Sequence, residues 1–222
     1  MSTPKTHSDV VAPFADDSTC DAQSCARDRI FQAAKDLFYR HGIRGVSVDA
    51  IAAGADTTKV TLYRVFSSKD DLVLQVLEDA SRRFWQSWDA VIAPYQGQPR
   101  KQIEALFLAL KDRICTEGTE RGCPLANAAV EVTDDENPAM RVIHEHKLEI
   151  ARRFRALCRE MGARDPDGLG DALSLLVSGV FAARLTGDTT EQIASVCRAV
   201  KALLDSPVLG AAPRKQNVRR AS

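Results

Sequence analysis

Hydrophobic residues recur at helical spacing from about residue 27 to residue 204 of this chain. In the first periodic segment, Ile30, Ala34 and Phe38 fall on one face of a helix, and Gly42 supplies its end. No segment alternates between apolar and polar positions as a half-buried strand does. The pattern therefore predicts an all-α fold of about nine helices.

Two short helices, separated by a tight turn, are predicted to follow the first. Ser47 is placed to cap a helix over residues 48–52, and Thr57 or Thr58 to cap one over residues 59–65. The later segments are bounded by Pro, Gly or capping residues. They predict helices over residues 68–92, 103–116, 124–132, 138–161, 169–185 and 190–204.

The predicted helix over residues 169–185 is apolar around almost its whole circumference, so it must be buried on more than one side. One side can face the core of its own chain. A second copy of the chain is the simplest cover for the other side, in a two-fold four-helix interface shared with residues 190–204. A central helix in a monomer is the alternative. The predicted interface of the homodimer consists of Leu169, Leu173, Leu176, Val180, Ala183, Ile193, Val196, Val200 and Leu204.

The charges of the 222 residues cancel, with 30 Lys and Arg against 30 Asp and Glu. The composition excludes collagen-like, low-complexity and wholly disordered chains. The charge is unevenly spread, because residues 26–69 carry a net charge of +4. Residues 1–25 are acidic and polar and are expected to form a disordered arm, whereas residues 208–222 form a basic flexible tail. A local excess of basic residues is compatible with binding to a nucleic acid, although the net charge of the chain is zero.

Neither a signal peptide nor a membrane segment is recognisable, so we expect a cytoplasmic protein without membrane contact. In that reducing compartment the six cysteines are expected to be free thiols. His144 and His146 point in different directions on a helix, and no paired Cys-x-x-Cys spacing occurs. No metal site and no cofactor is therefore predicted.

The two short helices, their supporting helix and the basic excess fit a helix-turn-helix unit. The run from Ile51 to Leu72 contains Thr-Leu-Tyr-x-x-Phe-x-Ser-Lys-x-x-Leu and resembles the amino-terminal DNA-binding domain of the TetR family of transcriptional regulators. The resemblance covers about residues 27–80 at the level of the motif. It implies a DNA-binding domain at residues 26–70 and an effector-binding and dimerisation domain at residues 71–207.

By this resemblance, residues at the amino end of the third helix enter the major groove of double-stranded operator DNA. Lys59 can reach a guanine edge or a phosphate, and Thr61 can reach a phosphate or a thymine methyl group. Lys69 adds positive charge at the start of the fourth helix, and Arg44 is expected to reach the DNA backbone or a minor groove. The expected DNA-binding residues are Arg44, Ser47, Thr57, Thr58, Lys59, Thr61, Tyr63, Arg64 and Lys69.

The turn between the two short helices departs from the family pattern. Asp56 and Thr57 stand where the family commonly has Gly and a buried Val. Asp tolerates the left-handed turn conformation better than most residues, so we expect the turn to form. Its carboxylate would repel phosphate, which predicts a reduced affinity for DNA.

The resemblance also implies that the carboxy-terminal helices hold a pocket for a small-molecule effector, whose binding changes the spacing of the two recognition helices in a dimer. Pro124 places Cys123 at a helix cap, where unpaired N–H groups and Arg121 favour a thiolate that an electrophile could modify. A buried, inert cysteine is the alternative. The expected effector residues are Trp85, Trp88, Phe107, Cys123, Asn127, His144, His146 and Phe154.

The predicted function is that of a ligand-responsive regulator of transcription, with repression as the family default. An all-α enzyme is one alternative, but the sequence contains no Glu-x-x-His pair, phosphate loop or nucleophile-elbow motif. A protein-binding helical module is another, but it would leave the Thr-Leu-Tyr motif and the local basic charge unexplained. We therefore expect no enzymatic activity.

Overall fold

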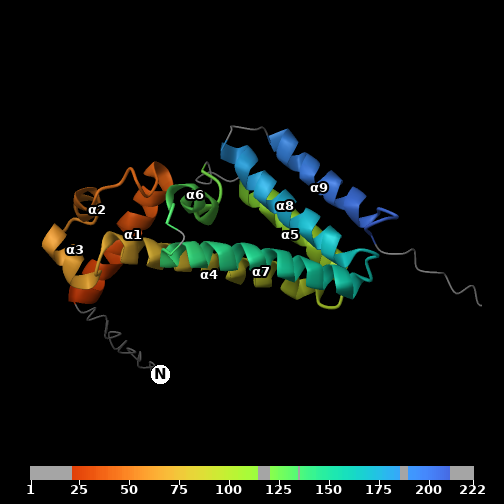
Figure 1. Ribbon diagram of the computed structural model, residues 1–222, viewed down its shortest axis with the longest axis horizontal. Helices are drawn as coiled ribbons and strands as arrows, with labels where there is room; N and C mark the ends of the chain where they lie inside the picture. The colour runs from red at the N-terminus through yellow and green to blue at the C-terminus, as the bar shows by residue number, and fades with distance from the viewer. Residues whose placement is uncertain (1–21, 115–120, 135, 186–189, 211–222) are drawn as a thin grey trace, which may run out of the picture.

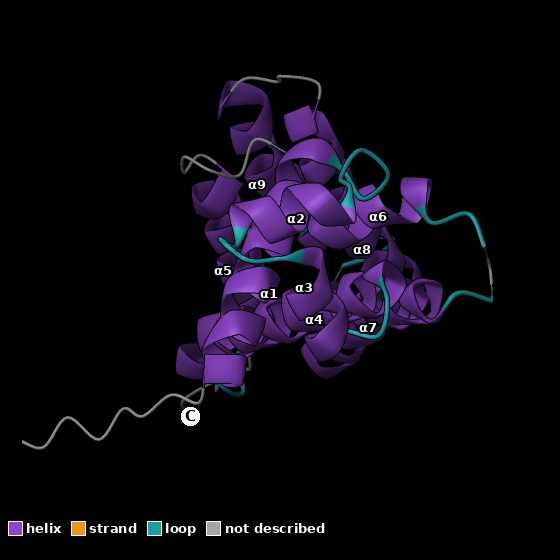
Figure 2. Ribbon diagram, turned by 90° about the vertical axis from the view of Figure 1, so that its left-hand side faces the viewer, coloured by secondary structure: helices purple, strands orange, loops and turns teal. Residues whose placement is uncertain are grey.

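The computed structural model describes residues 22–114, 121–134, 136–185 and 190–210 (Figure 1). The helices within residues 22–65 lie at one end of an elongated molecule, and two long helices, residues 69–92 and 138–161, run along its length. These residues contain helices and loops but no β-strand (Figure 2). The helices are α1 Ala22–His41, α2 Val48–Gly54, α3 Lys59–Val65, α4 Lys69–Ile92, the 3-10 helix η1 Ala93–Tyr95, α5 Pro99–Ile114, α6 Pro124–Glu131, α7 Pro138–Met161, α8 Pro166–Leu185 and α9 Thr190–Leu204. The all-α prediction is confirmed for the described part of the chain.

Side-chain caps fix where the short helices begin. Ser47 accepts a hydrogen bond from the backbone N–H of the third residue beyond it, and Thr58 and Ser68 do the same at the starts of α3 and α4. Each cap satisfies an N–H group that has no partner within its helix. Gly42 and Gly162, which follow α1 and α7, have φ angles of +78° and +75°. The predicted starts and ends of these helices are confirmed.

Three helices begin earlier than the hydrophobic pattern indicates. α1 begins at Ala22, inside the predicted disordered arm, while α5 begins at Pro99 and α8 at Pro166. Proline suits the first turn of a helix, and that turn needs no apolar face. Periodicity therefore locates such a helix only from its first buried residue. The predicted end of α5 at residue 116 and residues 1–21 and 211–222 lie outside the described residues.

The core consists of two clusters. One joins α1, α2 and α3 to the start of α4, to α6 and to the first turns of α7, and it contains Ile30, Leu62, Leu125 and Met140. The other lies between the rest of α4, α5, α7, α8 and α9. α6 therefore packs against the three amino-terminal helices, across the predicted domain boundary at residues 70 and 71.

Most of the predicted dimer residues are buried within their own chain. Leu176 and Ala183 are partly exposed, and the side chain of Ile193 lies outside the described part. An all-round apolar pattern cannot tell which side of α8 meets its own core. The buried members are Leu169, Leu173, Val180, Val196, Val200 and Leu204.

The exposed surface of α8 and α9 contains a shallow groove between the two helices. Leu175, 67% exposed, stands on the exposed side of α8. The other groove residues are mostly small, which lets another helix approach closely. The groove is lined by Leu175, Leu176, Gly179, Val180, Ala183, Ser195, Val196 and Ala199.

The cysteines within the described ranges are of two kinds. Cys123, Cys158 and Cys197 are free thiols, as predicted, whereas Cys25 is disulfide-bonded, so the expectation of free thiols is wrong at this position. Sequence spacing and compartment cannot reveal which sulfur atoms meet in space. None of the helices in the described ranges is long and apolar enough to cross a membrane.

Candidate DNA interface and effector pocket

α3 lies at one end of the molecule (Figure 1) and has polar and charged residues among its exposed side chains. Leu62 is fully buried and anchors the helix in the first core cluster. On the other side Lys59, Tyr63 and Arg64 are exposed, with Tyr63 47% exposed. A short helix with an anchored inner face and a cationic outer face is suited to enter the major groove of DNA.

Val60 belongs to the same outer face and is 81% exposed, although it is not among the predicted DNA-binding residues. A valine is usually read as a core residue. The helical period of α3 could have predicted this exposure. Leu62 and Phe66 are buried on one side of the helix, and at helical spacing Val60 then faces outward. An exposed apolar side chain between Lys59 and Thr61 is suited to contact a thymine methyl group.

The threonines at the start of α3 shape the helix end. Thr58 Oγ1 accepts from Thr61 N–H at 3.2 Å and lies 3.0 Å from Thr61 Oγ1. Thr57 is partly buried, and its backbone N–H donates to Ala52 O at 3.0 Å. Thr57 and Thr58 thus hold the turn and the cap, and Thr61 stands one turn into α3.

The turn before α3 adopts the conformation that the sequence predicts. Asp56 has a φ angle of +48°, the one positive value outside glycine in the described residues. Its side chain is exposed. Nearby, Lys59 Nζ lies 3.4 Å from Asp49 Oδ2 in an exposed ion pair. Such a pair is weak and screened by salt, so a phosphate can replace the aspartate.

Three other expected DNA residues lie around the loop between α1 and α2. Ser47 is exposed at the amino end of α2, where its Oγ caps the helix. Lys69 Nζ donates to Ile43 O at 2.6 Å, and Arg44 donates from its guanidinium to Thr133 Oγ1 at 3.1 Å. Lys69 and Arg44 therefore form hydrogen bonds that hold the α1–α2 loop. They do not lie on the exposed face of α3.

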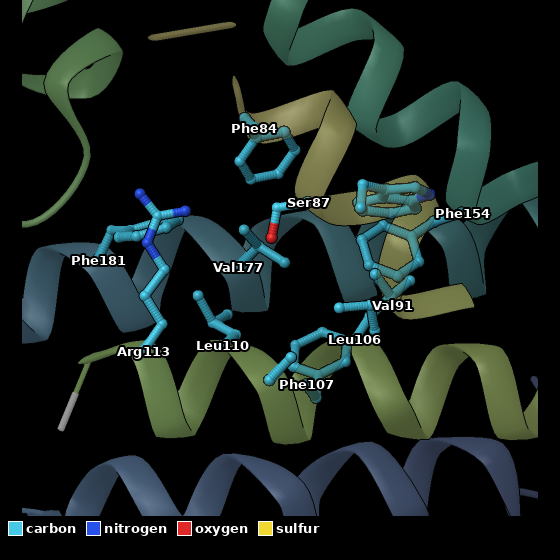
Figure 3. Close-up of a pocket in the computed structure, with 12 residues that line it drawn as sticks. Phe84, Ser87, Val91, Leu106, Phe107, Leu110, Arg113, Phe154, Val177 and Phe181 are labelled. Carbon is cyan, nitrogen blue, oxygen red and sulfur yellow. The ribbon is translucent and has the colours of Figure 1, made fainter. Parts of the chain in front are cut away.

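A pocket lies between α4, α5, α7 and α8, with a volume of about 90 Å³ (Figure 3). Trp88, Phe107 and Phe154, three of the predicted effector residues, line it. Their rings are packed together, with the Phe154 centroid 4.9 Å from that of Trp88 and 5.7 Å from that of Phe107. The residues that sequence reasoning missed include Phe84, Ser87, Leu110, Arg113, Val177 and Phe181.

Trp85 and His146 lie outside this pocket, in an open groove between α4 and α7. His146 is buried, and its Nδ1 lies 3.0 Å from Ser81 Oγ. Burial lowers the pKa of His146 to about 4, so the imidazole is neutral near pH 7. His144 is exposed, which confirms that the two histidines point in different directions.

Cys123 and Asn127 also lie away from the pocket, where α6 meets the amino-terminal helices. Cys123 is partly buried and packs against both core clusters. Burial raises the pKa of its thiol and outweighs the opposite effects of the α6 backbone N–H groups and of Arg113. The expected thiolate is therefore wrong, because loss of hydration exceeds the electrostatic gain at this helix cap.

Hydrogen bonds connect the segment before α6 to the end of α1. Tyr39 donates from its hydroxyl to Gly122 O at 3.4 Å and accepts from Arg121 N–H at 3.2 Å. The guanidinium of Arg121 donates to Arg40 O at 2.7 Å, and Asn127 Nδ2 donates to Arg121 O at 2.6 Å. Together with the Arg44 bonds at the end of α6, these contacts form what we call the α6 junction.

Comparison with known proteins places the α1 to α4 segment in one family. Residues 30–76 match the family model described as "Bacterial regulatory proteins, tetR family". This range contains the cap of α2, the turn at Asp56, all of α3 and the start of α4. The matched segment is thus the one that carries the proposed DNA-facing side chains.

Three similar proteins extend the comparison. The HTH-type transcriptional regulator Rv1556 of Mycobacterium tuberculosis is 31% identical over 112 residues, so the chain spans about half the length of this curated relative and half of the chain is covered. The TetR-family regulator SCO4454 of Streptomyces coelicolor is 32% identical with a TM-score of 0.75, over 81% of this chain and 94% of that one. A cysteine mutant of the regulator CifR, solved with 26-bp double-strand operator DNA, shares the fold at 22% identity with a TM-score of 0.70, over 79% and 95% of the two chains.

Proposed function

Because the chain belongs to the TetR family of bacterial transcriptional regulators, we propose that it binds operator DNA and represses transcription until a small molecule releases it. The family consists of regulators, not enzymes. The observation that carries the proposal is the outer face of α3, where Lys59, Val60, Tyr63 and Arg64 are exposed beside a capped amino end. Cations and an apolar group on one short helix can contact phosphates, guanine edges and thymine methyl groups.

The proposed active form is a homodimer. Two copies of α3 must be held about one helical turn of DNA apart to read adjacent major grooves. The groove between α8 and α9, at the other end of the molecule from α3, offers the exposed Leu175 beside small residues for a four-helix contact (Figure 1). Analytical ultracentrifugation tests this part. A chain that stays monomeric at micromolar concentration while binding a two-fold operator contradicts it.

The proposed effector site is the pocket between α4, α5, α7 and α8. An effector can shift the protein only if it binds one arrangement of α3 more tightly than the other. The path to α3 runs along α4 and through the α6 junction, where the first core cluster unites α6 with α1 to α3. In this proposal, the protein without effector mainly adopts the arrangement of α3 that binds DNA. Effector binding shifts the population toward the arrangement that does not bind DNA.

An electrophoretic shift assay with the DNA upstream of its own gene tests the proposal. We expect binding at nanomolar concentration that weakens steeply as salt rises, since each neutralised phosphate releases counterions. CifR, which shares the fold, was solved on operator DNA, which supports this choice of assay. If genome-wide recovery of bound DNA and the shift assay both fail to find a salt-sensitive site, the proposal is wrong.

A further inference from the structure

We propose that a second cavity, between α1, α4 and α6, binds a small uncharged molecule with a single ring. This cavity shares no lining residue with the pocket between α4, α5, α7 and α8. The inference therefore goes beyond the effector site proposed above. Only its last step, an effect of the ligand on operator binding, rests on the proposed function.

The walls of the cavity are mostly apolar. Its apolar lining consists largely of Phe38 of α1, Ile43 of the loop that follows, Val76 and Ala80 of α4, and Pro124 and Ala128 of α6. Moving an apolar molecule from water into such a space is favourable. A strongly hydrated molecule would lose its water here without finding replacements.

The charged residues around the cavity are engaged within the protein or by solvent. Lys35 Nζ lies 3.5 Å from Asp79 Oδ2 in an ion pair between α1 and α4. Glu131 Oε2 accepts the backbone N–H of Arg44 at 2.8 Å. Asp36 is exposed, so water screens its charge. A charged ligand would have to compete with these partners, and the cavity therefore favours an uncharged one.

The two uncharged polar side chains of the lining are also engaged. The Tyr39 hydroxyl donates to Gly122 O and accepts from Arg121 N–H, and Asn127 Nδ2 donates to Arg121 O. A buried water needs about two to four polar partners to be held firmly. Water in this cavity competes for groups that already have partners, so an apolar ligand can displace it.

The size of the cavity limits the ligand to one ring. Its volume is about 160 Å³, and a dry apolar cavity of about 150 Å³ is large enough to bind benzene. The pocket between α4, α5, α7 and α8 is smaller, at about 90 Å³. A ligand with two fused rings would require the helices around the cavity to move apart.

The cavity lies where α6 meets the helix-turn-helix unit. α1 and the α1–α2 loop form one side of it and α6 another, and these elements share the first core cluster. A ligand that fills the space stabilises the spacing of α6 and α1 that the structure shows and opposes any other spacing. If the two arrangements of α3 differ at this junction, ligand binding and operator binding are linked.

Urea unfolding in the presence of benzene tests the site. We expect benzene to raise the urea midpoint saturably, because a ligand that binds only the folded state stabilises it. Benzoate and benzylamine, which are similar in size but charged, should have no such effect. Ala128→Leu fills the cavity and should abolish the benzene effect. Ala126→Leu adds the same side chain at an exposed position of α6 and is the matched control, which should keep the effect.

A second variant keeps the test decisive if Ala128→Leu fails to fold. Ala80→Leu extends into the same cavity from α4, and Ala80 is only partly buried, so the larger side chain is easier to accommodate. The inference is overturned if benzene does not shift the midpoint of the parent. A benzene effect that survives in the folded cavity variants, or equal effects of benzene, benzoate and benzylamine, overturns it as well.

Operator shift assays separate this inference from the proposed function. We expect saturating benzene to change the operator affinity of the parent by about fivefold or more, the low end of coupling between two sites, and to leave that of Ala128→Leu unchanged. Operator binding by a parent that does not respond to benzene in either assay overturns the cavity site alone. Failure to bind operator without benzene contradicts the proposed function and not the cavity. Benzene binding that leaves operator affinity unchanged supports the site and overturns its link to DNA binding.

Discussion

The backbone N–H of Arg44 donates a hydrogen bond of 2.8 Å to Glu131 Oε2 and joins the α1–α2 loop to the end of α6. The guanidinium of Arg44 reaches Thr133 Oγ1 just beyond α6. Glu131 also fills the space beside Gly42, where an added Cβ would lie 2.7 Å from its Oε1. The loop that supports the helix-turn-helix unit is therefore held by the helix that follows Cys123, and displacement of α6 must disturb it.

Glu131→Ala is expected to release this loop. Because the bond is exposed, we expect a stability loss of only about 0.5–1.5 kcal/mol, the net value of a single hydrogen bond. The local effect should be larger, because the Arg44 N–H loses its acceptor. Hydrogen exchange followed by mass spectrometry measures it, and peptides covering the loop should exchange faster. Glu136→Ala, at an exposed position past the same helix, is the control. Unchanged exchange at Arg44 would show that Glu131 does not hold the loop.

Lys59→Ala is expected to weaken operator binding about tenfold and to reduce the slope of log affinity against log salt by about one. The reason is the loss of a cation from the exposed amino end of α3, where Asp49 is its weak partner in the free protein. Titrations at several salt concentrations measure both quantities. Lys101→Ala removes an exposed cation from α5 and should change neither, since α5 lies far from α3 along the molecule (Figure 1). Equal slopes for Lys59→Ala and the parent would place the DNA elsewhere.

Asp56→Asn is expected to tighten operator binding severalfold at low salt. Asn tolerates the left-handed conformation that Asp56 adopts, so the turn is kept while the negative charge near the phosphates is removed. Asp56→Ala removes the same charge, but its methyl side chain is disfavoured at a positive φ, and we expect a stability loss of about 1 kcal/mol. Comparing the melting temperatures and operator affinities of both variants separates the two effects. An affinity for Asp56→Asn equal to that of the parent would mean that the carboxylate does not face the DNA.

Helix ends were predictable because single residues determine them. Ser47, Thr58 and Gly162 each carry a local signal, either a side-chain acceptor or freedom at positive φ, that acts in the same way in any fold. The left-handed turn at Asp56 was predictable for the same reason. The motif around Tyr63 then identified the helix that carries the DNA-facing side chains.

Side-chain surroundings were less predictable, because they depend on helices that are distant in sequence. Leu173 and Leu175 are alike in the pattern, yet the first is fully buried and the second is 67% exposed. Arg44 could not be assigned to Thr133 from sequence, since 89 residues separate them. Cys123 stands at a helix cap, but the burial that raises its pKa comes from packing against both core clusters.

Stability should depend on pH through His146. Burial lowers its pKa in the folded state to about 4, below the ordinary value of 6.5 that applies to the unfolded chain. Between these two values the unfolded chain binds the proton and the folded protein does not, so the free energy of unfolding falls as pH falls. The contribution of His146 is fully present above about pH 6.5, and by pH 4 up to about 3 kcal/mol is lost.

His146→Gln is expected to flatten the pH dependence in this window, because an amide does not titrate there. Chemical denaturation at several pH values between 4 and 7 measures it. His144→Gln is the matched control: that side chain lies two residues away on the same helix but is exposed, so its removal should leave the profile intact. Glu149, whose pKa the Arg152 and Arg153 guanidiniums hold at about 2 against an ordinary value of 4.5, also contributes to the slope near pH 4 to 5. This contribution is common to the parent and both variants, so the difference between them reports His146. If His146→Gln keeps the full slope of the parent, the imidazole is not the group that is protonated on unfolding, and its neutral, buried state beside Ser81 would have to be reconsidered.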